Sequence, residues 1–222
     1  MGKKVAIIVD WDNFRKSLSF HARKARRDFF DYNDSKKLLG FFRNFLDADE
    51  ELYRIFVYTA QLMPLPDLKK VLDELEGRKK FSQKSRKAFK EGDYQKYYER
   101  ITAFNESMAA EEFFALRLGS IKIVGLDEDG SLDMVQKGVD MLLGLDIAHL
   151  AYLKLIDRIM VFSFDTDIKP ALKCARIYGI QVILPSIEGS SFQPSQILKK
   201  HADILRVKKF GGLIGKNSLE LD

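Results

Sequence analysis

Short apolar runs alternate with helical patterns along most of the chain. The first run, residues 5–9, is continuous and rich in β-branched residues, and it ends at an acidic residue, which is typical of a buried parallel strand. Apolar residues then recur at helical spacing, and Asp34 with Ser35 predicts the N-cap of a second helix that ends near residue 46. A β-rich run at residues 52–58 predicts the next strand. We therefore expect this part of the chain to form a β-α-β arrangement.

The segment from residue 67 to about residue 118 has a different character. Its pattern is charged and helical with no predicted strand, and a Ser- and Lys-rich patch at residues 81–87 predicts a loop inside it. Two apolar-rich runs, residues 120–126 and 131–136, then flank Asp127-Glu-Asp-Gly130. The Asp-Gly pair between such runs predicts the turn of a β-hairpin.

Strand and helix patterns alternate again over the rest of the chain. The predicted elements are a helix at residues 139–155, a strand at 158–163, a helix at 168–178, a strand at 180–184, a helix at 194–201 and a strand at 204–207. Such alternation predicts an α/β fold, with a Rossmann-like, mostly parallel sheet flanked by helices. We expect a single domain over residues 1–209, including a helical basic insertion at 67–118, and a C-terminal tail at 210–222.

Composition narrows the class of protein. The 222 residues are 46% hydrophobic and 12% aromatic, enough for one sizeable core, which excludes a disordered chain. The longest apolar stretch, residues 139–156, contains Asp146, His149 and Lys154, so no membrane span is expected. One cysteine and three histidines exclude an internal disulfide and a Cys/His zinc site. Without a leader pattern after Met1, we expect a cytoplasmic protein.

Positive charge is concentrated in short segments. Residues 78–90 hold seven basic and no acidic residues, more than the net charge of +5 for the whole chain. Two further clusters are Arg15, Lys16, Arg23, Lys24, Arg26 and Arg27, and then Lys199, Lys200, Lys208 and Lys209. The clusters predict a polyanionic partner, and the alternative is that each is a solvated helix face. The residues assigned to nucleic-acid binding are Arg15, Lys16, Arg78, Lys79, Lys80, Lys84, Arg86 and Lys87.

Acidic residues follow the predicted strands. Asp10-Trp-Asp12-Asn13 comes after the first strand, and Ser163-Phe-Asp165-Thr-Asp167 comes after the strand that ends near residue 162. Asp140 begins a predicted helix. In open α/β sheets the ligand crevice lies beyond the carboxyl ends of the strands. Four carboxylates, those of Asp10, Asp140, Asp165 and Asp167, are therefore expected to converge.

Converging carboxylates repel one another unless a proton or a cation neutralises them. Hard oxygen ligands without His or Cys suit Mg²⁺ or Mn²⁺. A bound cation of this kind assists phosphodiester cleavage, and nearby basic residues hold the backbone of the substrate. Metal-assisted hydrolysis of nucleic acid is the simplest interpretation that includes both the acidic and the basic residues.

Each acidic position also has a structural interpretation. Asp167 is as well suited to cap a helix as to bind a metal, and Asn13 either caps the first helix or holds Asp10 and a phosphate. Asp12 points away from Asp10 if both lie on one strand, because adjacent strand residues alternate faces. Asp146 is either a buried or exposed structural residue or a part of the site.

Three blocks in a fixed order carry a resemblance to a known family. They are Val5-Ala-Ile-Ile-Val-Asp10-Trp-Asp-Asn13, then Gln136-Lys-Gly-Val-Asp140-Met-Leu-Leu-Gly-Leu-Asp146, then Val161-Phe-Ser-Phe-Asp165-Thr-Asp167-Ile-Lys-Pro170 with Gly179-Ile-Gln-Val182 after it. Together the blocks span most of the chain. They resemble the NYN domain family, in particular its LabA-like branch, within the class of PIN-like nucleases.

This resemblance implies a PIN-like fold whose clustered aspartates bind Mg²⁺ or Mn²⁺ and cleave RNA, single-stranded in preference to duplex. It assigns Asp10 and Asn13 to the first motif, Asp140 to the middle one, and Asp165 and Asp167 to the last. The supporting positions are Asp146, Lys137, Ser163 and Thr166. The basic insertion is then assigned to RNA binding or to the formation of a homodimer.

The last motif departs from the family pattern Ser-Gly-Asp-Ser-Asp-Phe. Phe164 replaces the glycine, and Ile168 replaces the phenylalanine. We expect the bulky Phe164 either to narrow access for the substrate or to require a different backbone, because glycine tolerates conformations that phenylalanine does not.

Two other functions compete with a metal-dependent ribonuclease. A PIN-like module that binds RNA or protein without cleavage keeps the same fold. A phosphatase of the haloacid dehalogenase type also begins with a strand and Asp-x-Asp, but it typically has Thr or Val two positions beyond the second aspartate, where this chain has Phe14.

Overall fold

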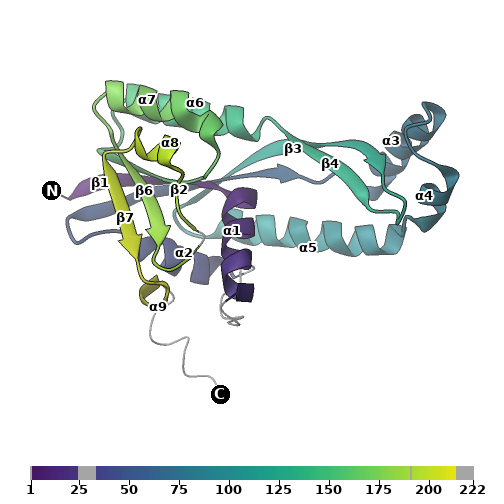
Figure 1. The fold of residues 1–222 in the computed structure, drawn as a ribbon, viewed down its shortest axis with the longest axis horizontal. Helices are drawn as coiled ribbons and strands as arrows, with labels where there is room; N and C mark the ends of the chain where they lie inside the picture. Colours follow the sequence, from purple (N-terminus) through teal and green to yellow (C-terminus); the bar gives the residue numbers. More distant parts are fainter. Residues whose placement is uncertain (1, 25–33, 191, 214–222) are drawn as a thin grey trace, which may run out of the picture.

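The computed structural model describes residues 2–24, 34–190 and 192–213, and Figure 1 shows their arrangement. One sheet holds the seven strands of the described residues in the order β4-β3-β2-β1-β5-β6-β7. The strands are β1 (Lys3–Asp10), β2 (Glu50–Gln61), β3 (Phe114–Leu126), β4 (Leu132–Lys137), β5 (Arg158–Phe162), β6 (Gln181–Ile187) and β7 (Ile204–Lys208). All neighbouring strands are parallel except the β3–β4 hairpin. The predicted α/β fold with a mostly parallel sheet is confirmed.

Helices cover both faces of this sheet (Figure 1). They are α1 (Trp11–Lys24), α2 (Ser35–Arg43), α3 (Leu65–Gly77), α4 (Gln83–Ala88), α5 (Glu91–Ala110), α6 (Val139–Tyr152), α7 (Lys169–Ile177), α8 (Gln196–Lys199) and α9 (Phe210–Leu213), with a 3₁₀ turn η1 (Thr166–Ile168). No helix among these is long and apolar enough to cross a membrane.

β1 lies in the middle of the sheet because its apolar run has no polar face. Its last six residues are buried, and successive side chains enter two different cores. Val5, Ile7 and Val9 pack with α1, α2 and part of α5, whereas Ala6 and Ile8 pack with α6 and α7. Asp10 ends the strand, where it pairs in register with Tyr58 of β2.

The distal part of the β3–β4 hairpin extends from this body together with α3, α4 and α5 as an arm (Figure 1). The arm has a small core of its own, built around Leu68, Leu72, Tyr94, Ile123 and Leu126. At its far end the hairpin turn packs closely on the end of α4. A Cβ atom at Gly130 would lie 2.4 Å from the Ala88 carbonyl carbon, and its φ of 84° also favours glycine.

The arm differs in part from the predicted helical insertion. β3 begins at Phe114, so residues 114–118, which were expected to be helical, form a strand that pairs with β2. The patch at 81–87, expected to be a loop, contains α4, and the Ser82 side chain caps that helix by accepting a hydrogen bond from the Ser85 N–H. Both differences depend on local capping or on partners distant in sequence. The hydrophobic periodicity of the segment gives no information about capping or about distant partners.

The C-terminal region also has more structure than expected. The first four residues of the expected tail, 210–213, form α9, and the Leu213 side chain is buried in the core of α1 and α2. Asn44, which follows α2, donates a hydrogen bond to the Leu213 carbonyl oxygen. Residues 214–222 lie outside the described part, as do Arg26 and Arg27 of the second basic cluster.

Candidate active site

Asp10 lies at the junction between β1 and α1. Its Oδ1 accepts a hydrogen bond from the Asn13 N–H, 3.2 Å away, so Asp10 caps the helix that Asn13 was considered to cap. Its Oδ2 accepts from the Ser163 hydroxyl, also at 3.2 Å. Burial, together with the charges of Asp140 and Asp12, raises the pKa of Asp10 to about 6, against the two hydrogen bonds that lower it.

The end of β5 supplies the second acidic group. Ser163 is buried, and its Oγ also accepts a hydrogen bond from the Asp165 N–H, so this one hydroxyl connects Asp10 with Asp165. Asp165 caps the η1 turn by accepting from the Asp167 N–H at 2.9 Å. Asp165 is thus the cap of this turn. Asp167, which was predicted either to cap a helix or to bind a metal, lies exposed within the turn.

Phe164 points away from these carboxylates. Its ring packs edge-on against Phe192 at a centroid distance of 4.6 Å and contacts the aromatic core beneath α1. Its φ is not positive, so the backbone here does not require glycine. Phe164 is also not among the residues that line the acidic cavity described below.

Asp140 reaches the site from the first turn of α6. The preceding Gly138 has a φ of 82°, and it turns the chain from β4 into α6. β3 passes close under this turn, where a Cβ atom at Gly119 would lie 2.6 Å from the Lys137 carbonyl oxygen. Partial burial raises the pKa of Asp140, and so do the charges of Asp165 and Asp167. Three separate elements therefore bring carboxylates together.

These carboxylates face a cavity of about 520 Å³. The residues that line it are Asp10, Asp12, Asn13, Lys16, Ser17, Met134, Val135, Gln136, Asp140 and Asp165. Within the described residues, none of its four aspartates takes part in an ion pair. The charges of Asp140 and Asp12 raise the pKa of Asp10, and the charge of Asp165 raises the pKa of Asp140. Lys16 also lines the cavity, but it forms no ion pair with any of these aspartates, so four carboxylates face a single described cation.

The donor chemistry of this cavity fits a hard divalent cation, since all the charged donors are carboxylate oxygens. In the described part of the chain, no group of three or more His, Cys, Asp or Glu residues is arranged to hold a metal ion. A cation would therefore have to draw the side chains of Asp10, Asp140 and Asp165 together.

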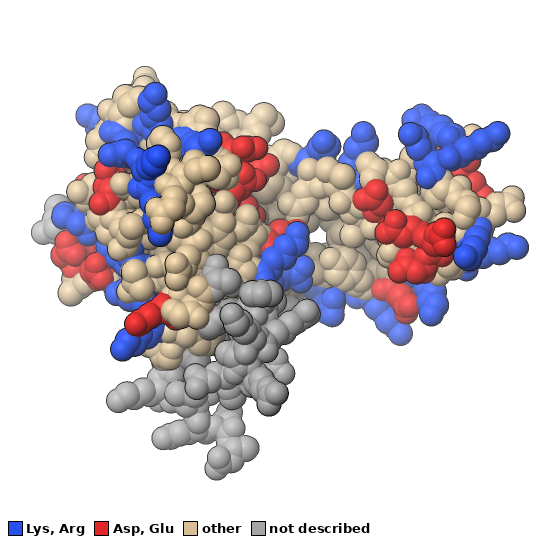
Figure 2. Space-filling view, viewed as in Figure 1, with Lys and Arg blue, Asp and Glu red and all other residues tan. Residues whose placement is uncertain are grey.

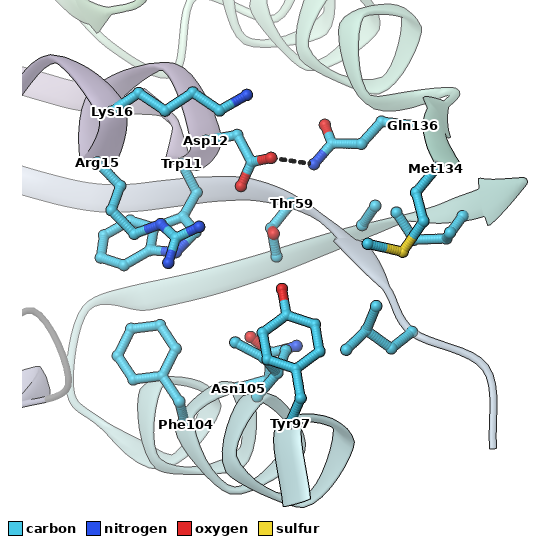
Figure 3. Close-up of a pocket in the computed structure, with 14 residues that line it drawn as sticks. Trp11, Asp12, Arg15, Lys16, Thr59, Tyr97, Phe104, Asn105, Met134 and Gln136 are labelled. Carbon is cyan, nitrogen blue, oxygen red and sulfur yellow. Dashed lines mark hydrogen bonds between the residues drawn. The ribbon is translucent and has the colours of Figure 1, made fainter. Parts of the chain in front are cut away.

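A second, smaller cavity of about 280 Å³ adjoins the first, between α1, α5 and the sheet (Figure 3). The two share Asp12, Lys16, Met134 and Gln136. At their boundary the Gln136 side-chain amide donates a 2.7 Å hydrogen bond to Asp12 Oδ2, drawn as a dashed line in Figure 3. We call this second cavity the α1–α5 pocket.

Several predicted site residues lie elsewhere. Lys137, Thr166 and Asp167 do not line the acidic cavity, and Arg15 lines only the α1–α5 pocket. Asp146 forms a structural cluster, because its Oδ2 accepts from the Tyr58 hydroxyl at 2.9 Å and from Arg117 Nε at 2.7 Å. Burial raises the pKa of that tyrosine, and so does Asp146.

The basic segment is partly compensated by acidic residues from other elements. Arg86 forms ion pairs with Asp73 and Glu76 of α3, and Lys84 pairs with Glu128 of the hairpin turn. The basic residues of this segment without an ion pair to a described residue are Arg78, Lys79, Lys80, Lys87 and Lys90. Figure 2 shows the basic side chains at the far end of the arm. Five of the seven charges are thus uncompensated.

Three polar lining residues, Asp12, Ser17 and Gln136, were not predicted to belong to the site. Asp12 was expected to point away from Asp10, but the strand ends at Asp10 and α1 begins at Trp11, so the alternation of a strand does not apply. Ser17 lies one helical turn beyond Asn13 on α1, a spacing the sequence already contains. Gln136 reaches the cavity because of the register of the hairpin with β3, where it pairs with Ile121.

Comparison with known proteins agrees with this architecture. The model of the NYN domain matches residues 4–206. Over 116 residues the chain is 30% identical to the uncharacterized protein y4oD of Sinorhizobium fredii, and the match covers 50% of this chain and 50% of that protein. The chain therefore spans about half the length of this curated relative. Among solved structures, VPA0982, a protein of unknown function from Vibrio parahaemolyticus, covers 94% of both chains at 19% identity and a TM-score of 0.46.

Proposed function

Because this chain belongs to the NYN domain family, a member of the PIN-like nuclease superfamily, we propose that it is a metal-dependent ribonuclease. One observation carries the proposal. Asp10, Asp140 and Asp165 come from three different elements, line one cavity, and form no ion pair with a described residue. Assembling like charges costs free energy, so such an arrangement favours a bound cation. The LabA-like branch stays a prediction.

The residues that would hold Mg²⁺ or Mn²⁺ are Asp10, Asp140 and Asp165, with Asp167 and Asn13 in support. A divalent cation bound there supplies charge neutralisation for the phosphodiester transition state and lowers the pKa of water. Ser163 orients the site, because its hydroxyl donates to Asp10 and accepts from the backbone of Asp165. Asp12 is held by Gln136 at the rim, and Lys16 beside it is placed to contact a phosphate.

RNA is the proposed substrate, and the exposed basic end of the arm is proposed to bind its backbone. Arg78, Lys79 and Lys80 are exposed and have no described ion pair, so they are available to phosphates. Replacing all three by Glu should weaken RNA binding and lower the salt dependence of log K by about one unit for each phosphate that the variant no longer binds. An unchanged salt slope in fluorescence anisotropy would remove the arm from the binding surface.

The decisive experiment is cleavage of an end-labelled single-stranded RNA by the wild type and by Asp140→Asn, each with Mg²⁺, Mn²⁺ or EDTA. Asp133→Asn is the matched control, because Asp133 is an exposed carboxyl on β4 that does not line the cavity. We expect cleavage by the wild type and the control with metal only, and at least about a hundredfold loss in Asp140→Asn. An Asp140→Asn protein as active as the control would overturn the assignment.

A non-catalytic RNA-binding module is the second candidate, favoured by the lack of a preassembled metal group among the described residues. Its signature in the same experiment is RNA bound but never cleaved by a folded wild-type protein. Release of phosphate from small phosphomonoesters, without RNA cleavage, would instead favour the phosphatase alternative.

A further inference from the structure

The α1–α5 pocket combines an apolar floor with polar groups that have no partner. Trp11 stacks on Phe104 at a centroid distance of 5.2 Å, and Ile101, Ile121 and Met134 add further apolar surface. The pocket lies between the body and the root of the arm, so residues of α1, β2, α5, β3 and β4 all contribute to it (Figure 3).

Arg15 is the clearest unsatisfied group in this pocket. Its Nε atom is buried and has no hydrogen-bond partner, the single such side-chain atom within the described residues. Arg15 lines the pocket, and Figure 3 shows its side chain extending from α1 toward it. A buried charged donor without a partner costs free energy, and an anionic or hydrogen-bonding ligand would recover it.

Other polar groups face the same space. Lys16, the Tyr97 hydroxyl and the Asn105 amide line the pocket and make no hydrogen bond to another described residue. In Figure 3 the Tyr97 hydroxyl points toward Thr59, across the interior of the pocket. The carboxylate of Asp12 is also present, but the Gln136 amide occupies one of its oxygens. Arg15 and Lys16 come from α1, whereas Tyr97 and Asn105 come from α5, so polar groups enter the pocket from both helices (Figure 3).

We propose that the α1–α5 pocket binds a single nucleotide of the RNA, next to the bond that is cleaved. Nucleotide pockets pair stacking surface with a few polar groups that read the base and hold the phosphate. Here the base lies against the apolar wall with its edge toward Asn105, and the phosphate lies at Arg15 and Lys16. A volume of about 280 Å³ is just below the range of roughly 300–1,000 Å³ for drug-sized ligands, so one nucleotide fills it.

The position of the pocket explains how it would serve the reaction. Four residues line both cavities, so a strand with one nucleotide in the α1–α5 pocket passes directly into the carboxylate cavity. Holding a neighbouring nucleotide fixes the position of the scissile bond. This assignment rests on the proposed ribonuclease function, but it can be tested without cleavage.

Trp11 makes the test direct, because it is the sole tryptophan of the chain and lines the pocket. The full chain with Mg²⁺ is titrated with AMP, CMP, GMP and UMP, which contain no diester to cleave, while tryptophan fluorescence is followed. Inorganic phosphate and ribose 5-phosphate are titrated in parallel as ligands without a base. We expect saturable quenching by at least one nucleotide at concentrations where the two base-free ligands have no effect.

Two pocket variants and one control sharpen the result. Arg15→Met should weaken nucleotide binding about tenfold to a hundredfold, the value of a charge-assisted hydrogen bond. Asn105→Leu should reduce the discrimination among the four bases. Lys36→Met removes an exposed charge on α2, away from the pocket, and should bind as the wild type does.

The outcomes separate the pocket from the nuclease. Asp140-dependent RNA cleavage with no nucleotide effect on Trp11, and with Arg15→Met as active as Lys36→Met, overturns the pocket and leaves the ribonuclease. Quenching that depends on Arg15 in a protein that never cleaves RNA supports the pocket and overturns the ribonuclease. Equal quenching by inorganic phosphate overturns the nucleotide assignment in favour of a simple anion site.

Discussion

Two buried carboxylates, those of Asp10 and Glu50, lie at opposite ends of the sheet and have opposite electrostatic surroundings. Asp10 ends β1 and faces other carboxylates, so burial and their charges raise its pKa to about 6. Glu50 begins the neighbouring strand β2, and its fully buried side chain receives two arginines. Arg206 donates to both Glu50 oxygens at 2.6 and 3.0 Å, and Arg158 donates at 2.7 Å.

The pKa values of Asp10 and Glu50 shift in opposite directions. Burial alone would raise the pKa of Glu50, but hydrogen bonds from Arg206, the Asp47 backbone and Arg158 outweigh burial and lower it. The Glu50 cluster ties β2 to β5 and to the edge strand β7, so it serves the fold. No described arginine or lysine forms an ion pair with Asp10, which is expected of a site that binds a charged ligand.

The largest effect on stability should come from a substitution at Glu50, whose charge the two arginines compensate. In Glu50→Gln, two nearly buried guanidinium groups lose their buried counter-charge and keep only the more exposed Asp47 and Asp49, so we expect a loss of about 3–5 kcal/mol in the free energy of unfolding. Urea denaturation measures it. Asp49→Asn is the control, since this exposed carboxyl also pairs with Arg158 and should cost less than about 1 kcal/mol. Equal effects of the two variants would contradict the comparison.

The two ends should also respond to pH with opposite signs. The folded-state pKa of Asp10 is raised, so its contribution to stability is present below pH 4 and is lost as the pH rises through about 6. A shift of about 2 units corresponds to at most about 3 kcal/mol. The pKa of Glu50 is lowered, so its contribution is lost as the pH falls.

The measurement is the unfolding free energy of the wild type minus that of Asp10→Asn between pH 4 and pH 7. This difference should become steadily less favourable to the wild type as the pH rises. A difference that does not change with pH would show that the Asp10 carboxyl is not perturbed.

Asp10→Asn itself should stabilise the protein at pH 7. The variant removes a desolvated charge and its repulsion by Asp140 and Asp12, but an amide offers one acceptor oxygen where the carboxylate uses two. The expected net gain is about 1–2 kcal/mol, together with loss of cleavage. Marked destabilisation would mean that Asp10 serves the fold as Glu50 does.

Added Mg²⁺ should give the smallest effect. If the acidic cavity binds it, saturation at about ten times Kd stabilises the wild type by about 1.4 kcal/mol, and EDTA reverses the gain. Asp140→Asn should lose this response, which a thermal shift measures, while Glu50→Gln keeps it. The same stabilisation in both variants would place the cation elsewhere.

The sequence was sufficient to predict the carboxylates that follow strands, because the carboxyl ends of parallel strands meet at one edge. Asp10 and Asp165 line one cavity for this reason, whereas Asp140 reaches it from the first turn of α6, after the antiparallel strand β4. Strand order was not readable in the same way. The Glu50–Arg206 contact joins residues 156 positions apart and depends on β7 being the edge strand, so no local pattern could reveal it.

The α1–α5 pocket could not be predicted from the sequence, for a related reason. It exists because the root of the arm packs α5 against α1. The insertion was predicted only as a charged helical segment, and the sequence did not indicate which elements of the chain it packs against. Arg15 was assigned to RNA from charge alone. Its place in the pocket depends on α5, whose Phe104 lies far along the chain and lines the same cavity.

The central place of β1 also affects how the protein is made. β1 pairs on one side with β2 and on the other with β5, where Val5 is in register with Arg158. Ribosomes add roughly 5–20 residues per second, so the second edge of this strand, which is apolar from Val5 to Val9, waits on the order of ten seconds for its partner. During that interval the nascent chain presents an unpaired hydrophobic edge that favours aggregation. Its yield in the cell should therefore depend on chaperones that shield the first half of the chain until β5 emerges.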